Sequence, residues 1–229
     1  MYAARMSSLR RLAFFAPAVL AALSGVAATA SAADNTPGQE ATNRLFLLVL
    51  LFAVGIGSFV LVLLVAVVFK FRKRKGHTAP VGNPKTHDNT LETLWTVIPA
   101  VILLFVGIAT FQTLAVTDVV PENPDVTVTV IGHQWYWEFH TLYPNGTWVN
   151  TTGELTVEVG QTVKLIIESA DVVHAFYIPE FGLKKDAFPG TPNVYWFQAR
   201  NAGDFVIQCA EYCGISHYVM VGSLHVVPG

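Results

Sequence analysis

The chain has 229 residues, of which 52% are hydrophobic and only 13% are charged, and its mean hydropathy is +0.47. This composition is too apolar for an ordinary soluble domain. The net charge of −2 conceals an uneven distribution of charged residues along the chain.

Residues 1–32 have the three parts of a secretory signal peptide. The basic start MYAARMSSLRR precedes the apolar stretch LAFFAPAVLAALSGVAA, and Ala30, Ser31 and Ala32 stand at the cleavage positions. The alternative is a retained third membrane helix, which the short, alanine-rich apolar part and the Ala-x-Ala ending disfavour. We expect the mature chain to begin near Ala33, outside the cytoplasm.

Residues 33–116 contain two apolar runs that are long enough to cross a membrane. The runs at about 45–69 and 94–116 contain 25 and 23 residues without a charge. A helix rises about 1.5 Å per residue, so either run spans a hydrocarbon core of about 30 Å. Pro99 predicts a kink, because membrane helices tolerate proline. Two buried core helices are the alternative, and uncharged runs of this length argue against it. We predict a transmembrane helical hairpin.

The segment between the two runs is strongly basic. Its charged residues are Lys70, Arg72, Lys73, Arg74, Lys75, Lys85 and a single acid, Asp88. The positive-inside tendency places such a loop in the cytoplasm. Both mature ends are then exoplasmic, and the C-terminal part lies in an oxidising compartment.

The C-terminal part, residues 117–229, is acidic. It has four bases, Lys164, Lys184, Lys185 and Arg200, against twelve acids, and four minus twelve is −8. Such a charge would speed association with a cationic partner and repel nucleic acid. Simple solubility is an equally good explanation of the charge taken alone.

The same part reads as short strands separated by glycine, proline and asparagine. Alternating or β-branched runs lie at 125–132, 154–160, 162–169, 194–199, 204–210 and 221–227. This pattern predicts a single all-β domain, a sandwich or a barrel.

The only two cysteines, Cys209 and Cys213, lie in CAEYCGISHYVM, residues 209–220, with His217 and Met220 close behind. A disulfide is one possibility in an exported chain, but it would close a very short loop. A zinc site is disfavoured, because the sequence lacks a second pair of Cys or His ligands at the usual spacing. Copper accounts for more of the residues, since copper sites combine Cys, His and a weak Met. A further imidazole could come from His174 in DVVHAFYIP.

The loop and its surroundings resemble subunit II of the cytochrome c oxidases, in the haem–copper oxidase superfamily. The resemblance rests on HAFYIPEFGLKKDAFPG, on ETLWTVIPA before the second span, on GHQWYWEF at 132–139, and on the C-x-E-x-C-G-x-x-H-x-x-M loop. It covers essentially the whole mature chain.

This resemblance implies a cupredoxin-like Greek-key sandwich with a binuclear copper centre, CuA. The terminal nitrogen ligands would be His174 and His217, and Cys209 and Cys213 would bridge the two coppers. Met220 would be the weak ligand of one copper. Glu211 would offer its carbonyl to the other copper, and its carboxylate would help to hold a Mg²⁺ or Mn²⁺ ion shared with subunit I.

Two further roles follow only from the resemblance. Trp135 matches the exposed tryptophan through which an electron enters, although a strand tryptophan is more often a packing residue. Glu92 matches the entrance of a proton channel that feeds subunit I, although by position alone it is a helix N-terminal charge. The segment after Trp135 is shorter than in mitochondrial-type members, so that Glu138, Glu154 and Glu158 are only plausible docking acids.

The implied function is electron transfer from cytochrome c, or another cationic donor, to haem in subunit I. There, haems and CuB reduce O₂ to water and protons are pumped; subunit III is a further expected partner. With no C-x-x-C-H motif, the donor must be a separate molecule. The alternatives are a copper-free quinol-oxidase subunit that acts as a docking module, and a membrane-tethered copper carrier. The complete ligand set disfavours the first of these, and Glu92 with ETLWTVIPA disfavours the second.

Overall fold

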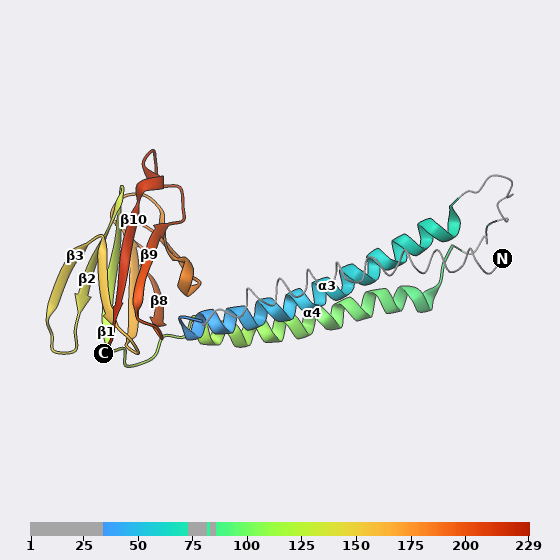
Figure 1. Cartoon of the computed structure of the whole chain (residues 1–229), viewed down its shortest axis with the longest axis horizontal. Coiled ribbons are helices and arrows are strands. Elements are labelled where there is room, and N and C mark those ends of the chain that lie inside the picture. Colours follow the sequence, from blue (N-terminus) through green and yellow to red (C-terminus); the bar gives the residue numbers. More distant parts are fainter. Residues whose placement is uncertain (1–33, 73–81, 83–85) are drawn as a thin grey trace. The chain divides into compact units, whose positions relative to one another are not determined.

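Figure 1 shows the computed structural model of the chain, which describes residues 34–72, 82 and 86–229. The predicted signal peptide and most of the basic loop lie outside these residues.

Two long helices come first, α3 (Pro37–Phe71) and α4 (Asn89–Thr117), and Pro99 lies inside α4. Both are long and apolar enough to cross a membrane, and neither contains a buried residue. The helices extend beyond the predicted spans because their polar ends also carry helix signals. At the start of α3, Thr36 is the N-cap, its hydroxyl accepts a hydrogen bond from the Gln39 backbone N–H at 3.0 Å, and Pro37 occupies the first helical position.

The C-terminal part is a β-sandwich, as predicted. Its strands are β1 (Val126–His133), β2 (Tyr136–Leu142), β3 (Trp148–Thr152), β4 (Glu154–Glu158), β5 (Thr162–Ser169), β6 (His174–Ile178), β7 (Leu183–Ala187), β8 (Asn193–Gln198), β9 (Gly203–Cys209) and β10 (Val221–Val227). They form two five-stranded sheets, β3-β2-β1-β5-β8 and β4-β10-β9-β6-β7. The pairs β1–β5 and β4–β10 are parallel, and the other paired strands are antiparallel.

Buried and outward-facing side chains alternate along the strands, and the buried ones form the core between the two sheets. Val128, Val130, Leu165 and Ile167 are completely buried, while their neighbours along β1 and β5 are only partly covered. Trp137 is also completely buried in this core. The alternation leaves a second, outward face on each sheet for polar side chains.

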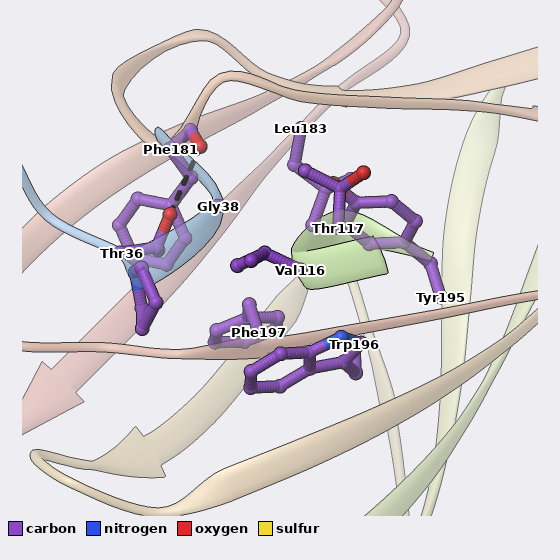
Figure 2. A pocket seen from close by; sticks show the side chains of 10 residues that line it. Thr36, Gly38, Val116, Thr117, Phe181, Leu183, Tyr195, Trp196 and Phe197 are labelled. Atoms are coloured by element: carbon purple, nitrogen blue, oxygen red, sulfur yellow. Dashed lines mark hydrogen bonds between the residues drawn. The ribbon is translucent and has the colours of Figure 1, made fainter. Parts of the chain in front are cut away.

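The start of α3 belongs to the same compact unit as the sandwich, which comprises residues 34–45 and 109–229 among those described. The Arg200 N–H donates to the Asn35 carbonyl at 2.9 Å, and the Thr36 hydroxyl donates to the Phe181 carbonyl at 3.2 Å. Arg200 also pairs with Glu40 at 2.8 Å. Thr36 and Phe181 help to line a small pocket together with residues of β8 and the end of α4 (Figure 2). This pocket contains no cysteine or histidine.

Candidate metal centre

The cysteine loop connects two paired strands at one end of the sandwich. Cys209 ends β9, and Met220 directly precedes β10, so that the antiparallel pair closes the loop. The Cys209 N–H donates to the Met220 carbonyl at 3.1 Å. Within the loop, the His217 N–H donates to the Gly214 carbonyl at 3.1 Å and begins the short 3₁₀-helix η2 (His217–Val219). The sheet therefore fixes both ends of the loop.

The loop brings its sulfur and nitrogen atoms together. The Sγ atoms of Cys209 and Cys213 lie 3.8 Å apart, and both cysteines are free thiols. A disulfide bond would require about 2.05 Å. The Cys213 Sγ lies 3.4 Å from Nδ1 of His217 and 3.8 Å from Sδ of Met220.

His174 approaches from the neighbouring strand. It begins β6, which pairs with β9 so that Phe176 lies opposite Cys209. Its Nδ1 is 3.8 Å from the Cys209 Sγ, and its side chain is completely buried. The Cys209 thiol also lies 3.2 Å from the Glu211 carbonyl oxygen, while the residue Glu211 is exposed.

These donors suit a pair of copper ions. Each sulfur faces one imidazole nitrogen and one weaker donor, a carbonyl at Cys209 and a thioether at Cys213. Thiolate and thioether are ligands that copper prefers, and two thiolates so close together can be shared by two metals. His174, Cys209 and Cys213 are also the one group of such side chains in the described residues whose ligand atoms all lie within 4.8 Å of one another.

The two thiols differ in acidity. Burial raises the pKa of Cys209, but hydrogen bonds with His174 and with nearby backbone groups outweigh it and lower this pKa to about 6. Burial and the neighbouring Cys209 thiolate raise the pKa of Cys213 to about 12. One thiolate therefore forms readily, and the second proton leaves when a metal cation offsets the repulsion between the two thiolates.

A second layer of residues, which sequence reasoning missed, holds these side chains in place. Asp171 Oδ1 lies 2.8 Å from Nε2 of His174, and its Oδ2 accepts a hydrogen bond from the Gln134 N–H at 2.7 Å. The Gln134 side-chain amide donates to the Cys213 carbonyl at 2.6 Å. A carboxylate on the far nitrogen fixes which nitrogen of a ligating histidine faces the metal. Asp171 stands only three residues before His174, which is the one signal that the sequence offered.

Trp135 lies beside the cysteine loop, in the turn between β1 and β2. A methyl group at Gly214, next to Cys213, would come within 3.3 Å of the Trp135 ring nitrogen. That nitrogen is buried and has no hydrogen-bond partner among the described residues. The resemblance led us to expect an exposed ring, and the structure instead covers it in part, because the loop packs over it.

Glu92 lies in a different part of the chain, in the first turn of α4. Its carboxylate accepts a hydrogen bond from the Asp88 N–H at 3.4 Å and pairs with Nδ1 of His87 at 2.8 Å. The Asp88 carboxylate in turn accepts from the Leu91 N–H at 3.3 Å. Locally, Glu92 therefore acts as an N-terminal helix charge.

Comparisons with known proteins show which family this chain resembles. The family model described as the transmembrane domain of cytochrome C oxidase subunit II matches residues 27–113, and the model of the periplasmic domain of that subunit matches residues 141–227. A probable cytochrome c oxidase subunit 2 of Rickettsia bellii is 31% identical over 212 residues, which cover 84% of this chain and 77% of the relative. The cytochrome c oxidase subunit 2 of Zea mays is 32% identical over 208 residues, covering 81% and 79%.

Among solved structures, the periplasmic domain of subunit II of the cytochrome oxidase of Bradyrhizobium japonicum is similar. It is 34% identical, and the match covers 48% of this chain and 88% of that domain with a TM-score of 0.45.

Proposed function

The chain belongs to the cytochrome c oxidase subunit II family, and we propose that it is the electron-accepting subunit of such an oxidase. It takes electrons one at a time from cytochrome c, or from a similar cationic donor, and passes them to haem in subunit I. There O₂ is reduced to water and protons are pumped. The chain is membrane-anchored, and we infer a bacterial inner membrane with the sandwich in the periplasm and the basic loop in the cytoplasm.

One observation supports this proposal above the others. Two thiols lie 3.8 Å apart, and each faces an imidazole nitrogen, His174 for Cys209 and His217 for Cys213. The proposed ligand set is completed by Met220 and by the carbonyl of Glu211. Two copper ions held by these residues would supply a one-electron redox centre whose charge would be spread over both metals.

The protein framework keeps these ligands still. His174 is completely buried and is held by Asp171, and Cys209 is part of a strand that pairs with both β6 and β10. Ligands that move little on electron transfer keep the reorganisation energy low. We propose that Trp135 carries electrons into the site, because its ring packs against the loop residue that follows Cys213.

Two carboxylates have proposed roles toward subunit I. Glu211 is exposed, so its side chain is free to help bind a Mg²⁺ or Mn²⁺ ion shared with that subunit. Glu92 is proposed to stand at the entrance of a proton channel. Replacing Glu92 with Gln should slow steady-state turnover of the assembled oxidase with unchanged copper content. An unchanged turnover rate would leave Glu92 with only its role at the helix start.

The direct test is copper analysis and electron paramagnetic resonance on the purified full-length chain. The full chain is required because residues 34–45 form one compact unit with the sandwich. We expect two coppers per chain and one unpaired electron shared equally by both nuclei. Cys209→Ser and Cys213→Ser should each lose this signal while the fold survives, and a Ser223→Ala variant serves as a control at an unrelated position of β10.

The alternative, a copper-free docking subunit of quinol-oxidase type, predicts no bound copper under any loading condition. Retention of two coppers in either cysteine variant would contradict the bridging role of the thiols.

A further inference from the structure

Two histidines flank one carboxylate on the outward face of the sheet that carries Trp135. The Nε2 of His133 lies 3.0 Å from one oxygen of Glu138, and the Nε2 of His140 lies 2.8 Å from the other. These three residues are here called the His–Glu–His cluster. Their side chains are between 24% and 30% exposed, so solvent and a docked protein can both reach them.

Strand register places the cluster beside the Trp135 turn. Glu138 and His140 alternate with the buried Trp137 and Phe139 along β2, so they lie on the outward face. His133 ends β1 directly before the turn, and its ring stacks on Tyr136 with centroids 4.6 Å apart. The cluster thus begins two residues from the proposed point of electron uptake.

The groups around the cluster are mainly acidic. In β5, Glu168 lies in register with Ile131, which in turn pairs with Glu138. Asp171 contacts the turn itself through the Gln134 N–H. The neighbouring edge strand β3 contributes no charged residue, and the nearest base in register on this face is Lys164, farther along β5. A cationic donor that approaches Trp135 therefore meets acids, with the two imidazoles among them.

We propose that the His–Glu–His cluster is a proton-responsive part of the donor-docking surface, which weakens the attraction for a cationic donor as the periplasm becomes more acidic. This inference rests on the proposed electron-accepting function. With both imidazoles neutral the cluster carries one negative charge, and with both protonated it carries one positive charge. Histidine is the side chain that ordinarily changes charge between pH 5 and 8.

The geometry allows this change of charge without rearrangement. A neutral imidazole can donate to the carboxylate through its Nε2–H, and a protonated one donates in the same way. Both hydrogen bonds therefore persist in both protonation states. The hydrogen bond from His140, partly opposed by burial and aided by His133, lowers the pKa of the Glu138 carboxyl, so this group stays ionised throughout the range.

The sign of the effect follows from the charges. A cationic protein is attracted by the cluster when both imidazoles are neutral and repelled when both are protonated. At about 10 Å in water, the interaction between two unit charges changes the association rate by roughly a factor of two. Two protons that face one positive charge of the donor should therefore change this rate by about fourfold. High salt should remove most of this difference.

The test measures oxidation of a lysine-rich cytochrome c by the assembled, copper-loaded oxidase. The second-order rate is determined at about 10 mM and about 200 mM ionic strength, from about pH 8 to about pH 5.5. The ratio of the low-salt rate to the high-salt rate isolates the electrostatic part from other pH effects. In the wild type this ratio should fall about fourfold as the pH falls.

Replacing His133 and His140 together with Gln should abolish most of this fall, and each single variant should remove about half of it. His225→Gln is the matched control, because His225 pairs with Asp204 at 2.6 Å in the other sheet of the same domain. It should retain the full pH dependence of the ratio. Copper content verifies that each variant has folded.

The outcomes separate this inference from the function on which it rests. If the double variant shows the same fall as the wild type, or if the ratio is near one at every pH, the proton-responsive surface is wrong although electron uptake stands. If the wild-type oxidase contains no copper and does not oxidise the cytochrome, the proposed function itself fails.

Discussion

Replacing Gly132 with Ala should displace His174, a buried residue and proposed metal ligand. A methyl group at Gly132 would come within 2.8 Å of Cδ2 and 3.1 Å of Cγ of the His174 ring, and within 3.2 Å of Trp137. Ordinary carbon contacts are about 3.5 Å or longer, so something must move by about 0.7 Å. The backbone of β1 cannot easily yield, because Gly132 is in register with Trp137 on one side and with Ser169 on the other.

The substitution should lower both the stability of the fold and the affinity for copper. Overpacking a well-packed core costs about 1–3 kcal/mol. The imidazole that has to give way is also held by Asp171 at 2.8 Å, so its displacement would strain a hydrogen bond as well as a ligand position. We expect the Gly132→Ala chain to bind copper with lower affinity and to show unequal sharing of the unpaired electron between the two nuclei.

Gly222→Ala provides the control. A methyl group there would come within 2.9 Å of the Gly153 carbonyl oxygen, and no proposed ligand is among its nearest neighbours. It should therefore lower the unfolding temperature with little change in the paramagnetic signal. A folded Gly132→Ala chain with an unaltered copper spectrum and affinity would refute the argument that this glycine makes room for His174.

Three further predictions concern Asp171, the two thiols and the N-cap of α3. Asp171→Asn removes a negative charge 2.8 Å from His174, so the reduction potential of the copper centre should rise in a redox titration; an unchanged or lower potential would contradict this. In the reduced apoprotein, iodoacetamide should label Cys209 first, at a rate that falls below about pH 6, while the buried Cys213 resists. Faster labelling of Cys213, read by mass spectrometry, would reverse that assignment. Thr36→Ala should destabilise the full chain in detergent by at least about 1 kcal/mol, because it removes both the N-cap and the hydrogen bond to the Phe181 carbonyl, whereas Thr36→Ser should be nearly neutral. Equal unfolding temperatures of these two variants would show that the Thr36 hydroxyl contributes nothing to stability.

Features that are local in sequence could be predicted, because local physics determines them. Apolar runs identified both long helices, and alternation identified a β-domain. The predicted helix ends were less accurate, since the first span was predicted to begin at residue 45 whereas α3 begins at Pro37. The sequence analysis overlooked the capping sequence Thr36-Pro37-Gly38-Gln39. This sequence lies ahead of the apolar run, so the helix begins several residues before the run does.

The proposed ligands were easier to find in the sequence than the residues that hold them in place. Four of the proposed side-chain ligands lie on one twelve-residue loop, and only His174 had to be added from elsewhere in the chain. The roles of Gly132 and Gln134 depend on contacts with residues far away in sequence, at His174 and Cys213. A hydrophobic pattern carries no information about such contacts, which arise only when the two sheets are packed together.

The acidic residues illustrate the same limit for the surface. By sequence, Glu138, Glu154 and Glu158 were equally plausible docking acids. In the structure Glu138 lies on the outward face of β2 near Trp135, whereas Glu154 and Glu158 lie on β4, an edge strand of the other sheet. Total charge can predict that a cation is attracted, but attraction is useful for electron uptake only where it holds the donor close to Trp135. Since coulombic steering falls off within about one Debye length, Glu138 and its two histidines should affect donor oxidation more than the acids of β4.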